Sequence, residues 1–299
     1  MPWTCYCRLK RRSGTIEVMC PSRDHFHYAI RSLSSAAHIA ILLSTLSVGL
    51  RAQNPDPLAL VKSVVANEDV AYRHRPICLY TSDERSDRTG GHLWEEHVAD
   101  VAEGKLRYLV AEDGVALSAA RRGSEAGRLR RMAANPQAFL SEERSRKDDE
   151  QHALRMFDLL PRAFRLEWLP SDGQWFRVAF SPDPSYVPRT YEERVLHGMS
   201  GTVLIDRSAL RLHQLEGKLA ADVSFGFGIL AVVHSGSSFS ITRDQIAPGV
   251  WKTTATKIDV EGRAVFFKTI ARKEEAIHKD FEILPASPSI AGAVDRLLR

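Results

Sequence analysis

Hydrophobic positions follow three patterns along this chain. Residues 36–50 form a largely apolar run of 15, AAHIAILLSTLSVGL. Between residues 57 and 67, apolar side chains recur at the spacing of an amphipathic helix. From residue 163 onward, short segments alternate between apolar and polar positions, as at Val203 and Ile205, and Gly, Asp, Ser and Pro separate them. The pattern predicts an apolar leader, a short helix and a long series of strands.

A helical insertion divides the predicted strands. Residues 116–160 are rich in Ala, Arg, Glu and Leu and break at Asn135-Pro136, which predicts a helical hairpin. Most separators between strands are too short for a parallel crossover, so neighbouring strands should be antiparallel. We predict an α+β fold with a large curved antiparallel β-sheet of roughly ten strands, a short N-terminal helix and a closing helix within residues 288–298. The predicted strands are 70–83, 92–101, 105–112, 164–169, 175–181, 201–206, 209–219, 227–234, 238–243, 250–260, 264–274 and 281–284.

The apolar run has the layout of a secretion signal. Arg31 precedes it, Arg51 follows it, and the small residue Ala52 suits cleavage. The run is shorter than the roughly 20 residues that a membrane-spanning helix needs. We therefore predict that residues 1–52 are a presequence, with Met19 as an alternative start, and that residues 53–299 form one periplasmic domain that does not cross the membrane.

Charge and cysteine content argue against several classes of function for residues 53–299. The presequence holds 7 of the 41 basic and 2 of the 37 acidic residues, so the remainder has a net charge near −1. A nucleic-acid partner, which would need a basic surface, is not expected. Cys78 is the one cysteine after residue 52 and lies in an apolar segment, which favours a buried structural thiol over a nucleophile and leaves no disulfide.

Candidate catalytic and metal-binding groups are weak. His92 and His97, with Glu95 and Glu96 between them, are the best local cluster, but a chance surface grouping is favoured over a metal site. No Gly-x-Ser-x-Gly turn presents a serine nucleophile. The glycine-rich segment 225–228 is not followed by a helix, so it does not indicate a phosphate site. No metal, cofactor or catalytic residue is predicted.

Two further features have two interpretations each. The second half of the chain supplies many large apolar residues, which could form either an ordinary core or an apolar cavity under a curved sheet. Residues 142–150 alternate positive and negative side chains, which is typical of a solvated helix face but could also be a contact surface for a partner. The residues alone leave both questions open.

One stretch resembles a known superfamily. The segment Gly201-Thr-Val-Leu-Ile-Asp206, followed by Leu210-Arg-Leu212 and Leu215-Glu-Gly217, is similar to a strand pair of the LolA/LolB superfamily, which includes RseB-type sensors and outer-membrane lipoprotein-sorting proteins. The similarity covers residues 198–281. It implies an unclosed β-barrel with a helical lid that binds a lipid or a lipidated protein without catalysis. The charged insertion at 116–160 departs from the sorting carriers.

These observations lead to three hypotheses. The first is a periplasmic, non-catalytic binding or carrier protein for a lipid acyl chain or a lipoprotein. The second is an RseB-like interaction or sensor module that contacts a periplasmic protein through residues 142–150. The third is a secreted hydrolase, for which no nucleophile–base pair can be named. The first hypothesis predicts that the acyl chain contacts Val203, Ile205, Leu212, Phe227 and Phe267.

Overall fold

The computed structural model of the chain describes residues 55–299, except 172, 226–230 and 265–267; of residues 145, 148, 149, 152, 264 and 268–270 it describes only the backbone. The chain divides into two units, residues 1–53 and 54–299. The predicted presequence, with its apolar run at 36–50 and Ala52, lies outside the described residues. All structural statements below concern the second unit.

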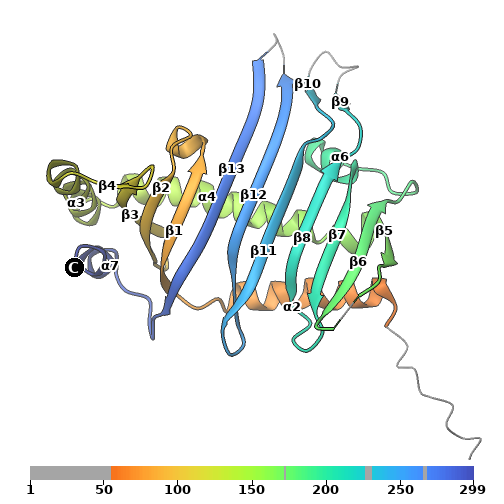
Figure 1. The fold of residues 1–299 in the computed structure, drawn as a ribbon, viewed down its shortest axis with the longest axis horizontal. Coiled ribbons are helices and arrows are strands. Elements are labelled where there is room, and N and C mark those ends of the chain that lie inside the picture. Colours follow the sequence, from red (N-terminus) through yellow and green to blue (C-terminus); the bar gives the residue numbers. More distant parts are fainter. Residues whose placement is uncertain (1–54, 172, 226–230, 265–267) are drawn as a thin grey trace, which may run out of the picture. The chain divides into compact units, whose positions relative to one another are not determined.

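One antiparallel sheet organises this unit (Figure 1), in the strand order β4-β3-β2-β1-β13-β12-β11-β8-β7-β6-β5, with β10 pairing with both β12 and β9. The end strands β4 and β5 are not paired with each other, so the sheet is not closed into a barrel. The predicted α+β class and open antiparallel sheet are confirmed, with 13 strands in the described residues. They are β1 Cys78–Ser86, β2 Trp94–Asp100, β3 Lys105–Glu112, β4 Val115–Ala116, β5 Phe164–Trp168, β6 Trp175–Pro182, β7 Met199–Asp206, β8 Leu212–Leu219, β9 Val223–Phe225, β10 Ala231–Val233, β11 Ser238–Ala247, β12 Val250–Ala264 and β13 Lys268–Ile283.

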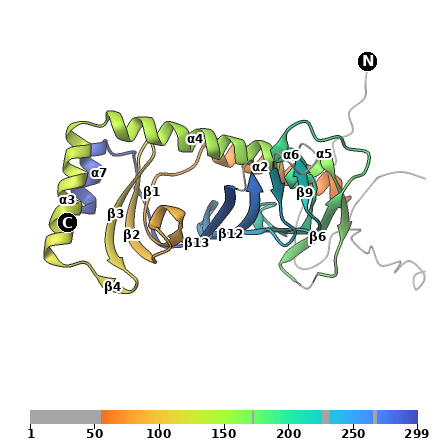
Figure 2. The same cartoon turned by 90° about the horizontal axis from the view of Figure 1, so that it is seen from above.

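The helices cover the two faces of the sheet unequally. Seen from above, the sheet is curved, and α4 crosses its concave side with α2 beneath it (Figure 2). On the other side of the β2–β3 end lie α3 and α7, which contact each other and β3. The described helices are α2 Pro57–Arg73, the 3-10 turn η1 Asp87–Thr89, α3 Ala119–Ala134, α4 Gln137–Phe157, α5 Leu160–Ala163, α6 Tyr191–His197 and α7 Ile290–Leu297.

Helix α2 is longer than predicted because its buried face continues through a charged residue. Asp56 caps the first turn by accepting a hydrogen bond from the Ala59 amide, and Pro57 occupies the first helical position. The buried positions are Leu60, Val61, Val64 and Glu68. Glu68 takes the next place on the apolar stripe, so the hydrophobic pattern stops while the helix does not. The prediction of a strand from residue 70 is wrong, because α2 continues to Arg73 and β1 begins at Cys78.

The predicted helical insertion is present as α3 and α4, separated at Asn135 and Pro136. Ser118 caps α3 by accepting a hydrogen bond from the Arg121 amide. The two helices turn away from each other at their junction, so that α4 extends across the sheet instead of lying alongside α3 (Figure 2).

Other predictions along the sheet differ from the structure. β8 begins at Leu212 rather than at residue 209, because Asp206 closes a turn by accepting hydrogen bonds from the Ser208 and Ala209 amides. The strands predicted at 264–274 and 281–284 are not separate, because β13 runs without a break from Lys268 to Ile283. Helix α6, capped by Thr190, was not predicted.

Two separate apolar cores lie at the two ends of α4. The first joins α2 and α5 to strands β5–β8 and includes Val61, Phe164 and Ile205. The second joins β2 and β3 to α3 and α7 and includes Leu129 and Val294. Aliphatic and aromatic side chains pack together in each core. Under α4, between the two cores, the structure has a cavity instead.

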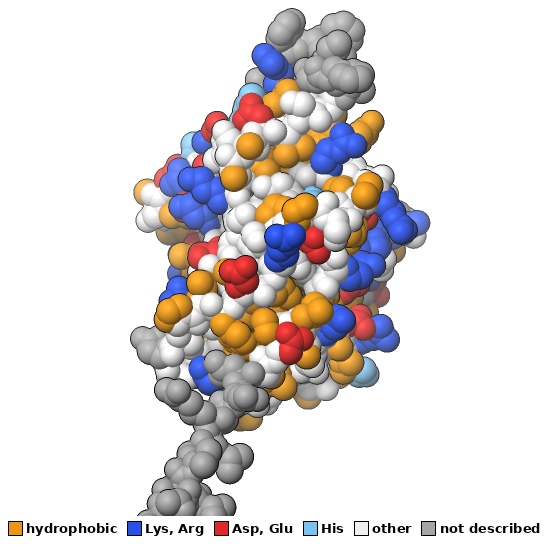
Figure 3. Space-filling model, turned by 90° about the vertical axis from the view of Figure 1, so that its right-hand side faces the viewer, with side chains coloured by type: hydrophobic (Ala, Val, Ile, Leu, Met, Phe, Trp, Pro, Cys, Tyr) orange, Lys and Arg blue, Asp and Glu red, His pale blue; other side chains and the backbone are white. Residues whose placement is uncertain are grey.

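The edge of the sheet at β5 is protected by charge. Arg165 and Glu167 alternate with the more buried Phe164, Leu166 and Trp168 along this edge strand. Charged side chains on an edge strand hinder pairing with a second chain. On the face that includes this edge, apolar side chains are interspersed with Lys, Arg, Asp and Glu rather than gathered into one patch (Figure 3).

Two glycines allow β7 and β8 to approach each other. Gly201 pairs directly with Gly217 in the sheet register. A Cβ atom on Gly201 would lie 1.9 Å from the carbonyl oxygen of Glu216, and one on Gly217 would lie 2.7 Å from the ring of Phe239. The glycines of the superfamily-like stretch are therefore required by packing in this chain, without reference to any ligand.

We predict that Gly201→Ala destabilises the domain by about 1–3 kcal/mol, which would lower Tm by roughly 2–10 °C, because the added methyl group must displace backbone. Gly123→Ala is the matched control. Gly123 lies inside α3 with no atom near its added Cβ, so alanine there should raise stability by about 0.5–1 kcal/mol. Calorimetry measures both. Equal shifts of the same sign would contradict the proposed clash.

Candidate functional site

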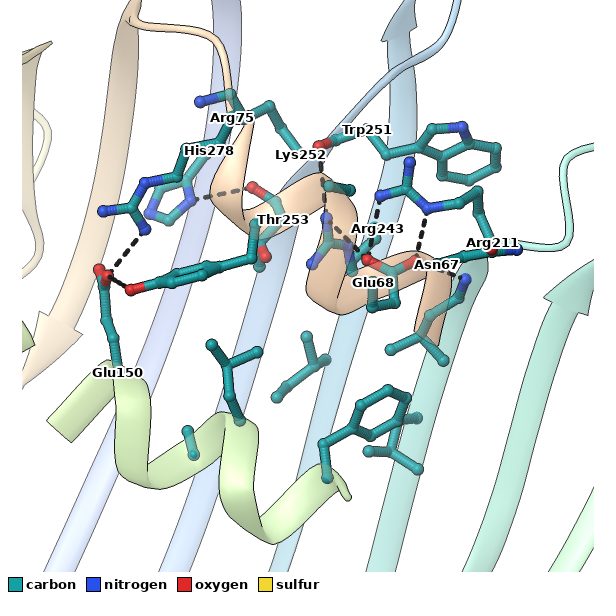
Figure 4. Close-up of a pocket in the computed structure, with 18 of the residues that line it drawn as sticks. Asn67, Glu68, Arg75, Glu150, Arg211, Arg243, Trp251, Lys252, Thr253 and His278 are labelled. Carbon is teal, nitrogen blue, oxygen red and sulfur yellow. Dashed lines mark hydrogen bonds and ion pairs between the residues drawn. The ribbon is translucent and has the colours of Figure 1, made fainter. Parts of the chain in front are cut away.

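A central cavity of about 1170 Å³ lies between the concave face of the sheet and the helices α2 and α4. Its lining residues come from both helices and from strands that include β1, β8, β11, β12 and β13. Side chains without nitrogen or oxygen gather between α4 and the strands, while polar groups lie nearer to α2 (Figure 4). The apolar lining includes Phe157, Phe180, Leu212, Phe239, Ile241 and Trp251.

Helix α4 is attached to the rest of the unit differently at its ends and in its middle. Near its start, Phe139 is buried in the second core, and at its end Met156 and Phe157 pack against the first. Residues 141–152 contain no apolar side chain. This middle part is held by polar contacts, such as the 2.9 Å hydrogen bond from Lys147 Nζ to the carbonyl of Ala102.

The predicted solvated face of residues 142–150 is wrong for two of its acids. Glu143 is only 5% exposed and accepts a 3.1 Å hydrogen bond from the amide of Lys105. Glu150 is half-buried over the cavity, where it accepts hydrogen bonds from Arg75 at 2.8 Å and from the Tyr72 hydroxyl at 3.2 Å. Sequence alternation alone could not show that the helix crosses a hollow and turns these side chains toward it.

Electrostatics at Glu150 favour its charged form. Burial alone would raise the pKa of this carboxyl, but Lys105 and Arg75 outweigh that effect and lower the pKa. The same environment acts on Tyr72, whose pKa is raised, mainly by burial. Glu150 therefore connects α4 to the segment that follows α2 by ionic hydrogen bonds.

A second buried carboxylate, Glu68, joins α2 to the sheet. It is 4% exposed and accepts two hydrogen bonds from the guanidinium of Arg211, at 2.7 and 3.0 Å, and one from the amide of Leu212 at 3.0 Å. Arg243 Nη2 lies 3.3 Å from Glu68 Oε2, the oxygen that also accepts from Arg211 Nη2. Asn67 adds a 3.0 Å hydrogen bond to the carbonyl of Leu210. Two arginines thus converge on one carboxylate at the cavity wall (Figure 4).

The polar wall continues toward β1. Lys252 Nζ donates to the carbonyl of Pro76 at 2.8 Å and lies 3.2 Å from Asp100 Oδ2. The neighbouring Cys78 is fully buried, and burial raises the pKa of its thiol. The predicted buried thiol is confirmed by its position.

The residues predicted to contact an acyl chain are placed differently from one another. Leu212 lines the cavity. Val203 and Ile205 are buried in the first core and do not themselves line the cavity, although they pair with the lining residues Leu215 and Leu212 in the sheet. Phe227 and Phe267 lie outside the described residues. Phe239 and Ile241 lie in the strand predicted at 238–243 and line the cavity, but they were not among the residues predicted to contact the chain.

A smaller cavity of about 300 Å³ lies beside the central one and shares Arg146 with it. Its wall contains a buried ionic cluster on β1–β3 and η1. Arg88 Nη2 lies 2.7 Å from Glu84 and 2.6 Å from Glu96, and Arg107 Nη1 lies 3.0 Å from Glu96. Burial raises the pKa of Glu84, but hydrogen bonds from Arg88 and Ser86 dominate and lower it to about 2.

Among the described residues, histidines form three pairs with aspartates, at 2.7, 3.2 and 3.4 Å. None of the six residues lines the central cavity. The cavity-lining His278 has Nδ1 3.1 Å from the carbonyl of Thr253, and burial lowers the pKa of its imidazole. The three pairs are His92–Asp113, His234–Asp222 and His213–Asp244.

A scan against protein-family models finds no match, and a search of curated proteins finds none either. Within the part of the chain that is described, no helix combines the length and the apolar character needed to span a membrane. The site must therefore be interpreted from its own geometry.

We predict that Glu68→Gln destabilises the domain by about 3–5 kcal/mol, because it leaves two partly buried arginines without their counter-charge. Asp69→Asn is the control on the same helix. Asp69 pairs with Arg73 at the exposed surface, so its loss should cost less than about 1 kcal/mol. Urea unfolding of both variants gives the comparison, and similar midpoints would show that the buried cluster is not stabilising.

Acid should weaken the ionic cluster around Glu84. Its folded-state pKa of about 2 lies below the usual value of about 4.3 for an unfolded chain. The stabilisation is therefore fully present above pH 4.3 and is lost as pH falls through about 2, amounting to on the order of 3 kcal/mol.

Unfolding free energies measured between neutral pH and pH 2 test this assignment. Glu84→Gln should be less stable at neutral pH but should lose less stability over the acid range than the unchanged protein. Parallel acid profiles for the two proteins would contradict it.

Proposed function

We propose that the protein is an exported, periplasmic, non-catalytic binding or carrier protein that takes the acyl chain of a lipid or a lipidated protein into the central cavity. The observation that carries the proposal is a cavity of about 1170 Å³ with apolar walls under a helix. Small-molecule sites typically measure roughly 300–1,000 Å³. The space exceeds that range, and its lining extends over several strands and two helices, so it has room for a chain-like ligand.

Burial of methylene groups supplies the driving force. Each CH₂ removed from water contributes about 0.8 kcal/mol, so ten of them would contribute roughly 8 kcal/mol before the costs of ordering the ligand. Side chains such as Phe180, Leu212, Phe239 and Ile241 provide the apolar contact surface. An alkyl chain needs no hydrogen-bond partner there.

The attachment of α4 provides a route for entry and release. Its middle is held over the cavity by polar contacts of Glu143, Lys147 and Glu150 rather than by apolar packing. When the helix moves, such contacts can be replaced by hydrogen bonds to water, whereas apolar packing has no such replacement. We infer that α4 serves as the lid of the cavity.

Two features of the sequence support the same proposal. The similarity of residues 201–217 to the LolA/LolB superfamily implies lipid or lipoprotein binding in a concave sheet. The signal-like run at 36–50 agrees with export. The alternative of an RseB-like contact surface on residues 142–150 gains less support, because Glu143 and Glu150 are already occupied in contacts within the domain.

We predict that Ile241→Trp reduces acyl-chain binding at least roughly tenfold, because the larger side chain fills the cavity that Ile241 lines. Ser240→Trp is the matched control, since adjacent residues of β11 face opposite sides of the sheet and Ser240 is not a lining residue. Binding of a fluorescent fatty-acid analogue to protein purified from cells that express the full chain gives the affinities.

Native mass spectrometry of the same preparations, with lipid extraction, identifies any ligand that copurifies. Retained binding in a folded Ile241→Trp protein would place the ligand elsewhere. Absence of any acyl species, together with no uptake of the analogue by the unchanged protein, would overturn the proposed function.

A further inference from the structure

The central cavity has apolar walls but an excess of positive charge. Counting histidines as neutral, its lining residues include four acids: Glu68, Asp100, Glu143 and Glu150. They include seven bases: Arg75, Lys105, Arg146, Lys147, Arg211, Arg243 and Lys252. The excess contrasts with residues 53–299 as a whole, whose net charge is near −1. Positive charge is therefore concentrated where the ligand would bind.

Each of the four acids already has a basic partner. Glu68 pairs with Arg211 at 2.7 Å, Asp100 with Lys252 at 3.2 Å, Glu143 with Arg146 at 3.2 Å, and Glu150 with Arg75 at 2.8 Å. This pairing leaves three bases beyond one-to-one neutralisation. They are Lys105, Lys147 and Arg243.

Arg243 is the best-placed of these three. It shares Glu68 with Arg211, at 3.3 Å compared with 2.7 Å for the primary partner. Its Nη2 also donates to the carbonyl of Trp251 at 3.3 Å. Its Nε is buried and has no hydrogen-bond partner among the described residues. The guanidinium is therefore incompletely satisfied, although 24% of its side-chain surface remains accessible.

The electrostatic environment agrees with this geometry. Burial lowers the pKa of Arg243; Glu68 opposes that effect, and Arg211 adds to the lowering. A buried guanidinium that shares a single carboxylate with a second arginine is only partly neutralised, which is unfavourable. An additional negative charge in the cavity would remove this penalty.

Arg243 also lies beside the apolar wall. Phe239, Ile241 and Arg243 all come from β11 and all line the cavity. The guanidinium is thus close along the strand to the surface proposed for the acyl chain, on the α2 side where polar groups gather (Figure 4). One ligand can contact both if it has an apolar chain and a charged end.

We propose that the cavity selects an anionic amphiphile, whose carboxylate or phosphate is bound by Arg243 while its chain lies against Phe239 and Ile241. This inference rests on the proposed function and adds the charge class of the ligand. A guanidinium matches either anion with paired hydrogen bonds. A free fatty acid and the head group of an anionic phospholipid share the required chemistry.

Displacement of a neutral fluorescent probe tests the charge selection. Palmitate, hexadecanol and hexadecylamine have chains of equal length and differ in the charge of the end group. The unchanged protein should bind palmitate roughly tenfold more tightly than hexadecanol, and hexadecylamine most weakly. Dilauroyl phosphatidylglycerol and phosphatidylcholine, compared in the same assay, distinguish a phospholipid head group from a free carboxylate as the source of the anion.

Variants then assign the selection to one side chain. Arg243→Gln should remove most of the preference for palmitate and leave hexadecanol binding nearly unchanged, and Arg243→Lys should restore part of the preference. Lys218→Gln makes the same change of net charge at an exposed residue of β8 that does not line the cavity, and it should have no effect. Circular dichroism and Tm confirm that each variant is folded.

The outcomes separate the two proposals. Equal binding of palmitate and hexadecanol by the unchanged protein, or full discrimination by folded Arg243→Gln, would overturn the anionic selection while leaving the carrier function intact. Failure of every amphiphile to displace the probe would overturn both. Preference for the anionic ligand that depends on Arg243 supports the inference, whichever lipid provides the anion.

Discussion

The buried carboxylate of Glu68 is the interaction on which the arrangement of this domain depends. It fixes the end of α2 to the start of β8 through Arg211 and the amide of Leu212, groups that are 143 and 144 residues away along the chain. A buried ion pair adds little stability compared with apolar packing, but it tolerates few alternative geometries. In this position it holds α2 at the concave face and thereby defines one wall of the cavity.

The cavity exists because α4 cannot fill it. A helix with an apolar stripe along its whole length would collapse onto the sheet and join the two cores. Residues 141–152 offer only polar side chains, whose burial without partners would be unfavourable. The helix therefore packs against the two cores at Phe139 and Phe157, and between them it makes polar contacts above the cavity. The polar composition that makes this segment a poor core helix makes it suitable as a movable cover.

Much of the fold could be predicted from local patterns, and the site could not. The alternation of apolar and polar residues and the short turns were sufficient to predict the antiparallel sheet. Asn135-Pro136 was sufficient to predict the break between α3 and α4. The end of α2 was missed because Glu68 interrupts the apolar period, and its partner Arg211 is remote in sequence. Val203 and Ile205 were predicted to contact an acyl chain but lie in the first core, because inward positions of a sheet face either a core or a hollow. Whether an inward side chain meets a core or a cavity depends on where α4 crosses the sheet, which local sequence patterns do not show.

The same limit explains why charge was not recognised as part of the site. Counted over residues 53–299, basic and acidic residues nearly cancel, and an averaged charge carries no information about a cavity. Folding brings Arg75, Arg211 and Arg243 from three separate segments to one hollow, with fewer acids than bases beside them. Desolvation makes that imbalance energetically important in a way that it would not be at the surface. An apolar chain alone would leave the imbalance in place, whereas a chain that ends in an anion would contact the apolar walls and also neutralise Arg243, which shares its one carboxylate partner with Arg211.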